Sequence, residues 1–332
     1  MLQAEFRSLM LFGIGLLIFA QQLQTASAND WPSWRGPHRD GIAVDETGLQ
    51  PEWADDGPKL KWQIDGIGRG YSSIAISDGR IFTMGSRKNG CELIALELDG
   101  GHELWATPTK GGNPNCTPTV DGGLVYALGR DGHLVAADVV TGKIAWQKDF
   151  PKDFGGSMMS GWGYSESPLL DGDRLVCTPG AKDAVVVALN KKTGETIWKS
   201  TMPDDIGGRG KDGAGYSSIV ISHAAGVKQY VQLTGRGVIS IDAENGKQLW
   251  SYNRIANGTA NIPTPLVKGD FVFCSTGYGT GAALLQIRKE GNRLVAEEKY
   301  FLDAKDMQNH HGGMIVYGDH IYCGHGHNNG FP

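Results

Sequence analysis

The sequence predicts an all-β fold, and within that class a β-propeller whose blades are four-stranded antiparallel sheets. Three observations carry this prediction. One segment ending in tryptophan recurs in a fixed register, a second segment recurs upstream of it, and the composition favours turns and large aromatics over long helices. The chain has 332 residues, with 49 Gly and 9 Trp, and is long enough to bury a large core.

The first recurring segment aligns on its final Trp without gaps. Its four copies span residues 92–105, 133–146, 185–198 and 237–250. Eight positions before the Trp lies an acidic residue or Asn, and four positions before it lies Gly; these are Glu97, Asp138, Asn190 and Asp242, and Gly101, Gly142, Gly194 and Gly246. The side-chain oxygen caps a tight turn, and Gly takes its left-handed position. Each copy is therefore predicted to be a β-hairpin ending in a buried aromatic.

The second recurring segment supplies two further strands. It reads as Ser or Thr, a small residue or Pro, an apolar pair, a polar turn with Gly, and an apolar strand. The copies are residues 71–85, 116–129, 165–180 and 262–277, with a longer turn in 216–235. Together the two segments form a module of four antiparallel strands in about 40–50 residues, which is the size of a propeller blade.

The modules in this chain amount to about 5.5 blades. Trp62 reads as an isolated final strand without its own blade, and the fifth module ends in a degenerate hairpin at 284–300 that lacks Trp. A sixth begins at 310–326, shortly before the chain stops at Pro332. We expect a C-terminally truncated propeller that would have seven or eight blades in a longer chain, at one blade per roughly 45 residues.

The N-terminus has the pattern of an export signal. Arg7 precedes an apolar run at 9–20, and Ala26-Ser27-Ala28 matches a cleavage site. The run is shorter than the roughly 20 residues that span a bilayer. We expect a signal peptide over 1–28, an extension over 29–56 and the propeller over 57–332, in an exported periplasmic or extracellular protein. Because no Cys precedes Cys91, we expect no lipid anchor, and no later segment is predicted to span a membrane.

Charge and cysteine content narrow the function classes. The formal net charge is −5, without the basic stripe of a nucleic-acid-binding protein, so nucleic acid is not a predicted partner. The five cysteines are Cys91, Cys116, Cys177, Cys274 and Cys323. The last three take equivalent positions in different modules, and rotation around a ring separates such positions too far for a disulfide. The cysteines are predicted to be free thiols.

The D-x-x-T-G-x-x-x-W module resembles the PQQ-type repeat of quinoprotein dehydrogenases, which also occurs in propellers of the BamB type. The resemblance covers about 57–332. The segments at 31–43, 161–169, 261–265 and 309–313 resemble secreted PQQ-like (pyrroloquinoline quinone repeat) propeller proteins of planctomycete type. The resemblance implies a structural role between neighbouring blades for the repeat tryptophans, which are Trp62, Trp105, Trp146, Trp198 and Trp250.

The resemblance also describes a cofactor site, which this sequence does not match. PQQ enzymes are expected to hold the quinone at the ring centre, beside an adjacent Cys-Cys disulfide and a calcium bound by Glu, Asn and Asp. No Cys-Cys pair occurs in the chain, and no matching acidic set falls at the repeat positions. We therefore predict no catalytic residue and no cofactor, with PQQ plus calcium as the alternative. Five of the nine His fall between 310 and 327, but no carboxylate is placed beside them, so no metal site is predicted.

Comparison of the modules points to one mouth of the central channel. The residues that precede the innermost strand vary from module to module; they are Tyr71, Cys116, Glu166, Tyr216, Pro263 and His311. Aromatic residues, Arg and His around a concavity suit a sugar, a peptide or a flat ring, and the alternative is that they only fill the channel. The ligand-binding candidates are Arg69, Tyr71, Trp162, Tyr164, Glu166, Tyr216, Asn309, His310 and His311.

The sequence favours an exported, non-catalytic binding or scaffold module. Its candidate partners at the channel mouth are protein or carbohydrate. Two alternatives stay open: a PQQ-dependent dehydrogenase that oxidises alcohols or sugars, and a BamB-like factor in outer-membrane protein assembly. Fold alone does not separate them, because one fold hosts many functions.

Overall fold

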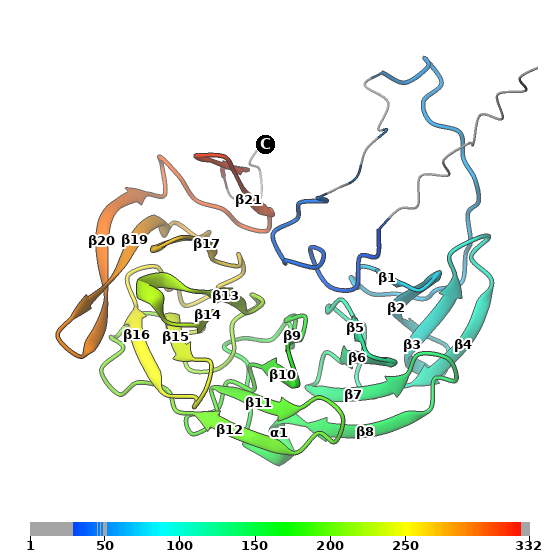
Figure 1. The fold of residues 1–332 in the computed structure, drawn as a ribbon, viewed down its shortest axis with the longest axis horizontal. Coiled ribbons are helices and arrows are strands. Elements are labelled where there is room, and N and C mark those ends of the chain that lie inside the picture. Colours follow the sequence, from blue (N-terminus) through cyan, green and yellow to red (C-terminus); the bar gives the residue numbers. More distant parts are fainter. Residues whose placement is uncertain (1–28, 45, 47, 49–51, 327–332) are drawn as a thin grey trace, which may run out of the picture.

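The computed structural model describes residues 29–44, 46, 48 and 52–326. The predicted signal peptide, 1–28, and His327 therefore lie outside the described residues. Within the described part, the strands form five four-stranded antiparallel sheets and one two-stranded sheet. The sheets stand side by side in an arc around a hub, with the first-numbered strand of each sheet innermost (Figure 1). The predicted all-β propeller and its four-stranded blades are confirmed.

Each four-stranded blade runs outward from the hub in sequence order. The first three blades are β1 (Ala75–Ser77), β2 (Arg80–Arg87), β3 (Gly90–Glu97) and β4 (Glu103–Pro108); β5 (Thr119–Asp121), β6 (Leu124–Leu128), β7 (His133–Asp138) and β8 (Ile144–Asp149); and β9 (Leu169–Asp171), β10 (Arg174–Cys177), β11 (Val186–Asn190) and β12 (Thr196–Ser200). A short helix, α1 (Phe150–Phe154), follows β8.

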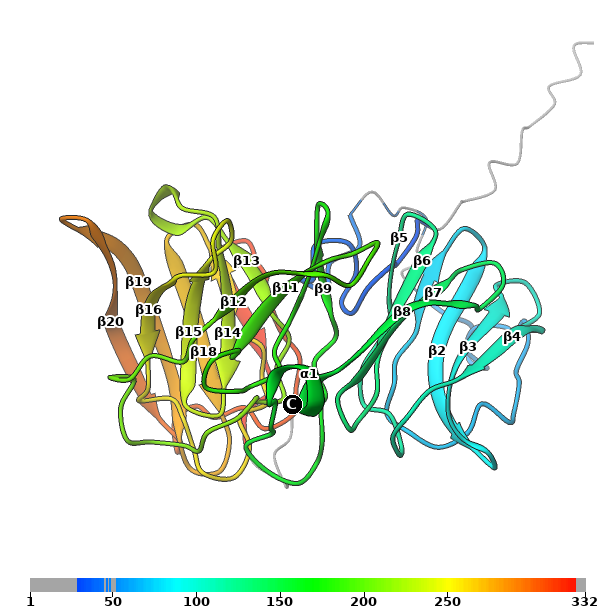
Figure 2. The same ribbon diagram turned by 90° about the horizontal axis from the view of Figure 1, so that it is seen from below.

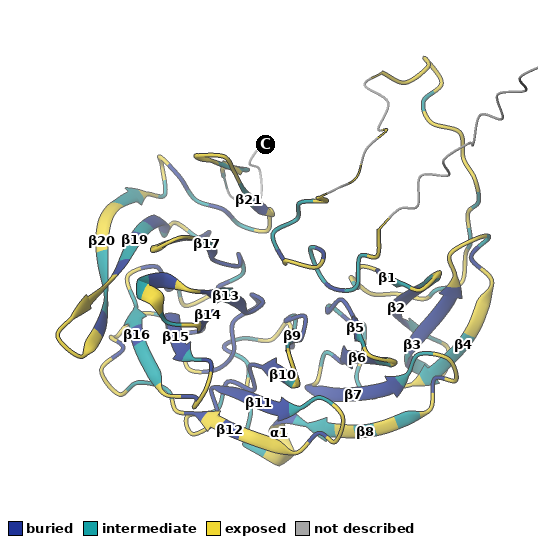
Figure 3. Cartoon of the chain, viewed as in Figure 1, coloured by how far each residue is buried: buried dark blue, intermediate teal, exposed yellow. Residues whose placement is uncertain are grey.

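The remaining blades follow the same plan. They are β13 (Val220–Ser222), β14 (Gln229–Thr234), β15 (Gly237–Asp242) and β16 (Gln248–Tyr252), with a 3₁₀ turn η1 (Ala224–Gly226); β17 (Leu266–Lys268), β18 (Phe271–Thr276), β19 (Gly281–Glu290) and β20 (Arg293–Asp303); and the pair β21 (Met314–Tyr317) and β22 (His320–Cys323). The blades stand upright around the hub (Figure 2). Their middle strands are buried, and their outer strands are half-buried or exposed (Figure 3).

Three of the four predicted hairpin turns are capped by a side chain as the sequence predicts. Asp138 Oδ1 accepts hydrogen bonds from the backbone N–H groups of Val140 and Thr141, at 3.0 and 2.8 Å. The equivalent Asn190 and Asp242 side chains accept from the same two positions of their own turns. Gly142 follows with a φ of 69°, a left-handed conformation that side chains with a Cβ avoid. The repeated acid and Gly are therefore requirements of one turn geometry.

The indoles of three repeat tryptophans, Trp105, Trp146 and Trp198, lie against the hairpin turn of the next blade. A Cβ at Gly142 would stand 2.6 Å from the Trp105 ring, and one at Gly194 would stand 2.7 Å from the Trp146 ring. Trp146 Nε1 also donates to the carbonyl of Lys191 in the following blade, at 2.9 Å. Gly therefore serves a second purpose in the repeat, because only hydrogen at this position lets neighbouring blades close.

Trp62 lies in the same relation to the first blade. A Cβ at Gly101 would stand 2.7 Å from the Trp62 ring, and Trp62 and Ile64 pack with Ile81 in one apolar cluster. The first blade is thus covered on this side by a segment that is not part of a described sheet. This is the arrangement that the expected isolated final strand would give.

The structure shows which residue of the fifth blade takes the place of the missing Trp. In the fifth blade, Tyr300 pairs with Leu284 one step before a register shift, as Trp250 pairs with Ser240 before the shift in the fourth blade. Tyr300 therefore takes the backbone position of the missing Trp, which alignment on Trp alone does not reveal.

The predicted free thiols are confirmed, since all five cysteines are unpaired.

The docking of Gly against Trp can be tested by adding a single methyl group. Gly194→Ala adds a Cβ that meets the Trp146 ring, whereas Gly172→Ala adds one in the same blade with nothing within 4 Å. Both residues have positive φ, 73° and 60°, so both substitutions carry a backbone strain of about 1–2 kcal/mol. We expect Gly194→Ala to lower the free energy of unfolding by about 1–3 kcal/mol more, measured by chemical denaturation. Equal losses in the two variants would contradict the docking role.

Candidate functional site

The first part of the N-terminal extension lies at the hub (Figure 1). We call residues 31–43 the N-terminal plug; it passes between the innermost strands on one side of the arc (Figures 1 and 2). Trp31 forms a β-bridge with Ile76 of the first blade, and the carbonyl of Pro32 accepts from Val120 N in the second, at 2.8 Å. The Arg35 guanidinium donates to the carbonyl of Met314 in β21. The plug thereby connects modules at opposite ends of the chain.

Arg39 is the deepest contact of the plug. Its side chain is 6% exposed, and the guanidinium donates to three backbone carbonyls, of Ser167 at 2.8 Å and of Pro168 and Ile219 at 3.0 Å. These carbonyls belong to the chain just before β9 and β13. Burial lowers the pKa of Arg39 to about 10, which leaves it charged at neutral pH. One cation therefore joins two blades at the hub axis.

Glu166, a predicted mouth residue, lies in the interior beside this cation. It is 2% exposed. Its Oε1 accepts from Thr178 N at 3.0 Å and its Oε2 accepts from Gln232 Nε2 at 3.1 Å. Burial raises the pKa of Glu166 to about 8, although the bond from Thr178 and the charge of Arg39 act in the opposite direction. The carboxyl is therefore mostly protonated at neutral pH.

A cavity of about 600 Å³ opens at the hub; we call it the hub cavity. Six of its lining residues hold the same place in six successive modules, four positions before the innermost strand: they are Tyr71, Asn115, Ser165, Tyr216, Ile262 and His310. Trp162, Ala260, Tyr278 and His311 complete the lining. Its volume lies within the range of about 300–1,000 Å³ that is typical of small-molecule sites.

The register of the inner strands corrects the sequence alignment. Cys116, Glu166, Pro263 and His311 each lie one residue after the position that Tyr71 and Tyr216 occupy relative to the strand start. In extended chain, a shift of one residue turns a side chain to the other face. Cys116 and Glu166 are accordingly buried, at 0% and 2% exposure, and Pro263 is buried as well, whereas His311 stays exposed and lines the cavity. Sequence reasoning missed Asn115, Ser165 and Ile262 for this reason, and it missed Tyr278 and Ala260 because the repeat pattern does not mark them.

The structure brings together five of the nine predicted candidates. The cavity lining contains Tyr71, Trp162, Tyr216, His310 and His311. It does not include Arg69, Tyr164, Glu166 or Asn309. Tyr164 is 3% exposed, with its hydroxyl donating to the carbonyl of Pro179 at 2.9 Å. Asn309 is 1% exposed and donates from Nδ2 to the carbonyl of Gly324 at 3.0 Å. Arg69 pairs through its backbone with Ser86.

Two residues of the cavity wall hold the backbone of Trp162. Asn115 Nδ2 donates to the Trp162 carbonyl at 3.0 Å, and Trp162 N donates to the Tyr216 hydroxyl at 3.5 Å. The Tyr216 hydroxyl also shares a 2.5 Å hydrogen bond with Ser160 Oγ. The Trp162 side chain is nevertheless 66% exposed. Its backbone is therefore fixed while its indole stands open at the cavity.

A group of rings forms another part of the wall. His310 Nε2 and the Tyr278 hydroxyl are 2.9 Å apart in a hydrogen bond, and the two rings meet edge to face with centroids 4.8 Å apart. The rings of His310 and His311 are 4.1 Å apart. The hydrogen bond and the ring contacts orient His310 within the wall.

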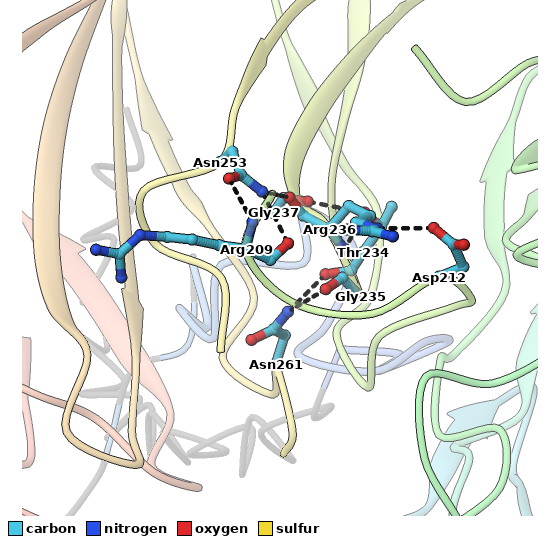
Figure 4. Close-up of polar contacts among 8 residues, drawn as sticks. All are labelled: Arg209, Asp212, Thr234, Gly235, Arg236, Gly237, Asn253 and Asn261. Carbon is cyan, nitrogen blue, oxygen red and sulfur yellow. Dashed lines mark hydrogen bonds and ion pairs between the residues drawn. The ribbon is translucent and has the colours of Figure 1, made fainter. Parts of the chain in front are cut away.

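A polar network behind the wall positions the residues that precede β17 (Figure 4). Asn261 Nδ2 donates to the carbonyls of Thr234 and Gly235, at 2.9 and 3.1 Å. Asn253 in turn accepts from Arg209 N at Oδ1 and donates from Nδ2 to the Arg209 carbonyl, both at 3.0 Å. Asn261 stands between the two cavity residues of this segment, and its buried amide holds the backbone that carries them.

The hub cavity does not fit the quinone and calcium that the fold family suggests. PQQ carries carboxylates, which require cationic partners, and calcium requires several oxygen ligands that usually include carboxylates. Among the described residues, none that lines the cavity is Lys, Arg, Asp or Glu. Across the described residues, no group of three or more His, Cys, Asp and Glu side chains could hold a metal ion. His325, one of the five clustered histidines, accepts a hydrogen bond at Nδ1 from Gln308 N at 3.2 Å.

The described part of the chain has no helix with the length and apolar character needed to cross a membrane.

Sequence comparisons show which known proteins this chain resembles. The family model described as outer membrane protein assembly factor BamB matches residues 43–161 and 89–331. BamB of Shewanella oneidensis is 24% identical over 270 residues, covering 76% of this chain and 63% of that protein. BamB of Burkholderia pseudomallei is 27% identical over 239 residues, covering 69% and 58%. The chain thus spans less than two thirds of the length of these relatives.

Quinoprotein enzymes are also among the similar proteins. The dehydrogenase subunit of the quinone alcohol dehydrogenase of Acetobacter aceti is 30% identical over 210 residues, covering 58% of this chain and 26% of that protein. Two solved structures are similar in fold. BamB of Moraxella catarrhalis has a TM-score of 0.56 at 14% identity, covering 80% of this chain and 72% of that one. Quinohemoprotein alcohol dehydrogenase of Comamonas testosteroni has a TM-score of 0.53 at 15% identity, covering 90% and 50%.

The contribution of the Arg39 hydrogen bonds to stability can be tested by removing the charge of this side chain. Arg39→Met leaves three buried carbonyls without their donor, and hydrogen bonds to charged groups each contribute about 1.5–3 kcal/mol. We expect the free energy of unfolding to fall by about 3 kcal/mol or more, measured by chemical denaturation. Arg209→Met, at an exposed position, is the matched control and should change it by less than about 0.5 kcal/mol. A similar, small effect of both substitutions would show that the plug is not a structural part of the hub.

The Glu166 carboxyl should make stability depend on pH. Its pKa rises from 4.5 to about 8 on folding, so the folded state binds the proton more tightly. The stabilisation is complete below about pH 4.5 and is lost as the pH rises through 8, with a slope of at most about 1.4 kcal/mol per unit. We expect Glu166→Gln to flatten this part of the profile in denaturant titrations between about pH 5 and pH 8. The same slope in both proteins would assign the dependence to other groups.

Proposed function

We propose that this chain, which belongs to the family described as outer membrane protein assembly factor BamB, is an exported, non-catalytic propeller that binds a ligand in its hub cavity. The proposal rests on one observation above all. Six modules contribute side chains to the cavity from the same backbone position, and the six residues all differ except for a repeated Tyr. The fold dictates where these side chains lie, but it does not dictate their chemistry.

The composition of the lining supports binding rather than catalysis. Acid–base and nucleophilic catalysis rely on a titratable group that a third residue orients, often a carboxylate. Among its described residues, the lining provides two imidazoles, of His310 and His311, and contains no Asp or Glu. His310 bonds to a Tyr hydroxyl instead. Aromatic rings with a few polar groups are typical of ligand pockets.

The proposal includes export through the segment 1–28. The mature chain is expected to begin at Asn29, which places the N-terminal plug within its first residues. N-terminal sequencing of the protein from a membrane-bounded compartment or the culture medium tests this directly. A chain that retains Met1 in the cytosol would contradict it.

A second candidate function is a role in outer-membrane protein assembly. The names of the relatives favour it, since two of those described above are outer membrane protein assembly factors. Affinity purification of the tagged full-length protein from its own cells separates the candidates. Recovery of a β-barrel assembly complex in stoichiometric amounts supports the assembly role, whereas a monomeric protein without that complex supports the binding role.

The non-catalytic assignment can be tested by reconstitution. Full-length protein is incubated with PQQ and calcium, a panel of alcohols and sugars, and an artificial electron acceptor. We expect no reduction of the acceptor above the rate without protein, because the cavity lacks cations for the quinone carboxylates. A quinoprotein alcohol dehydrogenase treated identically is the positive control. Substrate-dependent reduction by this protein would overturn the proposal.

A further inference from the structure

We propose that the hub cavity binds a neutral sugar chain. This inference rests on the proposed binding function and adds the ligand class to it. Its basis is a lining whose described residues combine open aromatic faces and polar oxygens able to accept from hydroxyl groups, and include no side chain that is permanently charged. Each of these three properties excludes or favours particular ligands.

The aromatic faces provide the main contact area. The side chains of Trp162 and Tyr71 are 66% and 78% exposed, although both line the cavity. Aromatic rings that are exposed together at one cavity are typical of ligand-binding grooves. A sugar ring has apolar C–H faces that pack flat against such rings. Two open rings at one cavity therefore suit a chain with more than one sugar unit.

The open rings stand on a backbone that is already fixed. The Trp162 carbonyl and N–H are held by Asn115 and Tyr216, and Tyr71 N donates to the carbonyl of Pro114 at 2.7 Å. Fixing these segments before binding reduces the entropy lost when a ligand docks. The two rings can therefore form a preformed platform for a ligand that itself has limited flexibility.

The polar groups of the lining match hydroxyl groups. Asn and Ser side chains carry oxygens that accept hydrogen bonds, and each sugar hydroxyl can donate one. The lining contains such oxygens at Asn115 and Ser165; the N–H and O–H groups of these two residues already donate to backbone carbonyls of the wall, so their oxygens are the groups left for a ligand. The described residues of the lining include no Lys, Arg, Asp or Glu, so an anionic or cationic ligand would lose hydration without gaining an ionic partner from them. The ligand class is therefore neutral.

The backbone at the cavity argues against an extended peptide. Peptides that bind by strand addition need free backbone N–H and C=O groups at a sheet edge. At the cavity these groups are used between modules: Tyr216 N donates to the Asn261 carbonyl at 2.8 Å, as Tyr71 N does to that of Pro114. A peptide would have to rely on the side chains alone, which provide no charge to read its sequence. The sugar chain is the ligand that the lining favours.

The proposal can be tested by calorimetry with defined oligosaccharides. The full-length protein is titrated with neutral hexasaccharides of glucose, N-acetylglucosamine, mannose and xylose, and with a hexamer of galacturonate. We expect at least one neutral hexasaccharide to bind and the anionic hexamer to bind more weakly. Trp162→Ala should weaken the binding about tenfold or more. Trp53→Ala removes a Trp that is 58% exposed outside the cavity, and it should leave the affinity unchanged.

The outcomes separate this proposal from the function on which it rests. If none of the neutral sugars binds, the sugar class is wrong. The proposed binding function would still stand if heptapeptides from a library of extended sequences bound to the protein and lost affinity in Trp162→Ala. If sugars bind equally well to Trp162→Ala, the hub cavity is not their site. Turnover with PQQ and calcium would overturn the binding function itself.

Discussion

The hub depends on a chain of hydrogen bonds that runs from blade to blade. Thr117 N donates to Ser167 Oγ, Ser167 N to Ser218 Oγ, and Ser218 N to Thr264 Oγ1, at 3.0, 3.0 and 2.9 Å. Each hydroxyl sits two positions before its innermost strand, so the bonds fix neighbouring strands at one height. Because extended chain alternates its side chains, this register decides which residues face the cavity and which are buried.

The N-terminal plug depends on the same register. Arg39 binds carbonyls two or three positions along the chain from the cavity residues Ser165 and Tyr216, a distance of about 7–10 Å in extended backbone. The buried cation is satisfied by carbonyl dipoles, while the neighbouring Glu166 takes up a proton more readily than in water. A buried charge is tolerable when several hydrogen bonds surround it. The plug and the cavity therefore occupy successive levels of one hub.

Much of the fold could be predicted from the sequence because it repeats. The Asp–Gly turn and the terminal Trp recur at fixed spacing, and each follows from a local requirement of turn geometry or close blade contact. Tyr300 was missed because an aromatic of another type holds the same position in the strand register. The position of the plug could not be predicted, since its contacts reach residues more than 100 positions away. The cavity lining was predicted in part. An error of one residue in strand register explains why Glu166 and Cys116 were expected at the channel mouth although both are buried.

The division between repeated and variable positions gives the cavity its chemical freedom. The hydroxyls of Ser167, Ser218 and Thr264, two positions before their inner strands, accept hydrogen bonds from the preceding blade, so a change there weakens the ring. Two positions earlier, the side chains of Tyr71 and Ser165 face the cavity instead of a neighbouring blade. Substitution at that level alters the cavity while the blade-to-blade bonds stay intact. A scaffold of this kind can acquire a new ligand class through few side chains, because the register that positions them is set elsewhere.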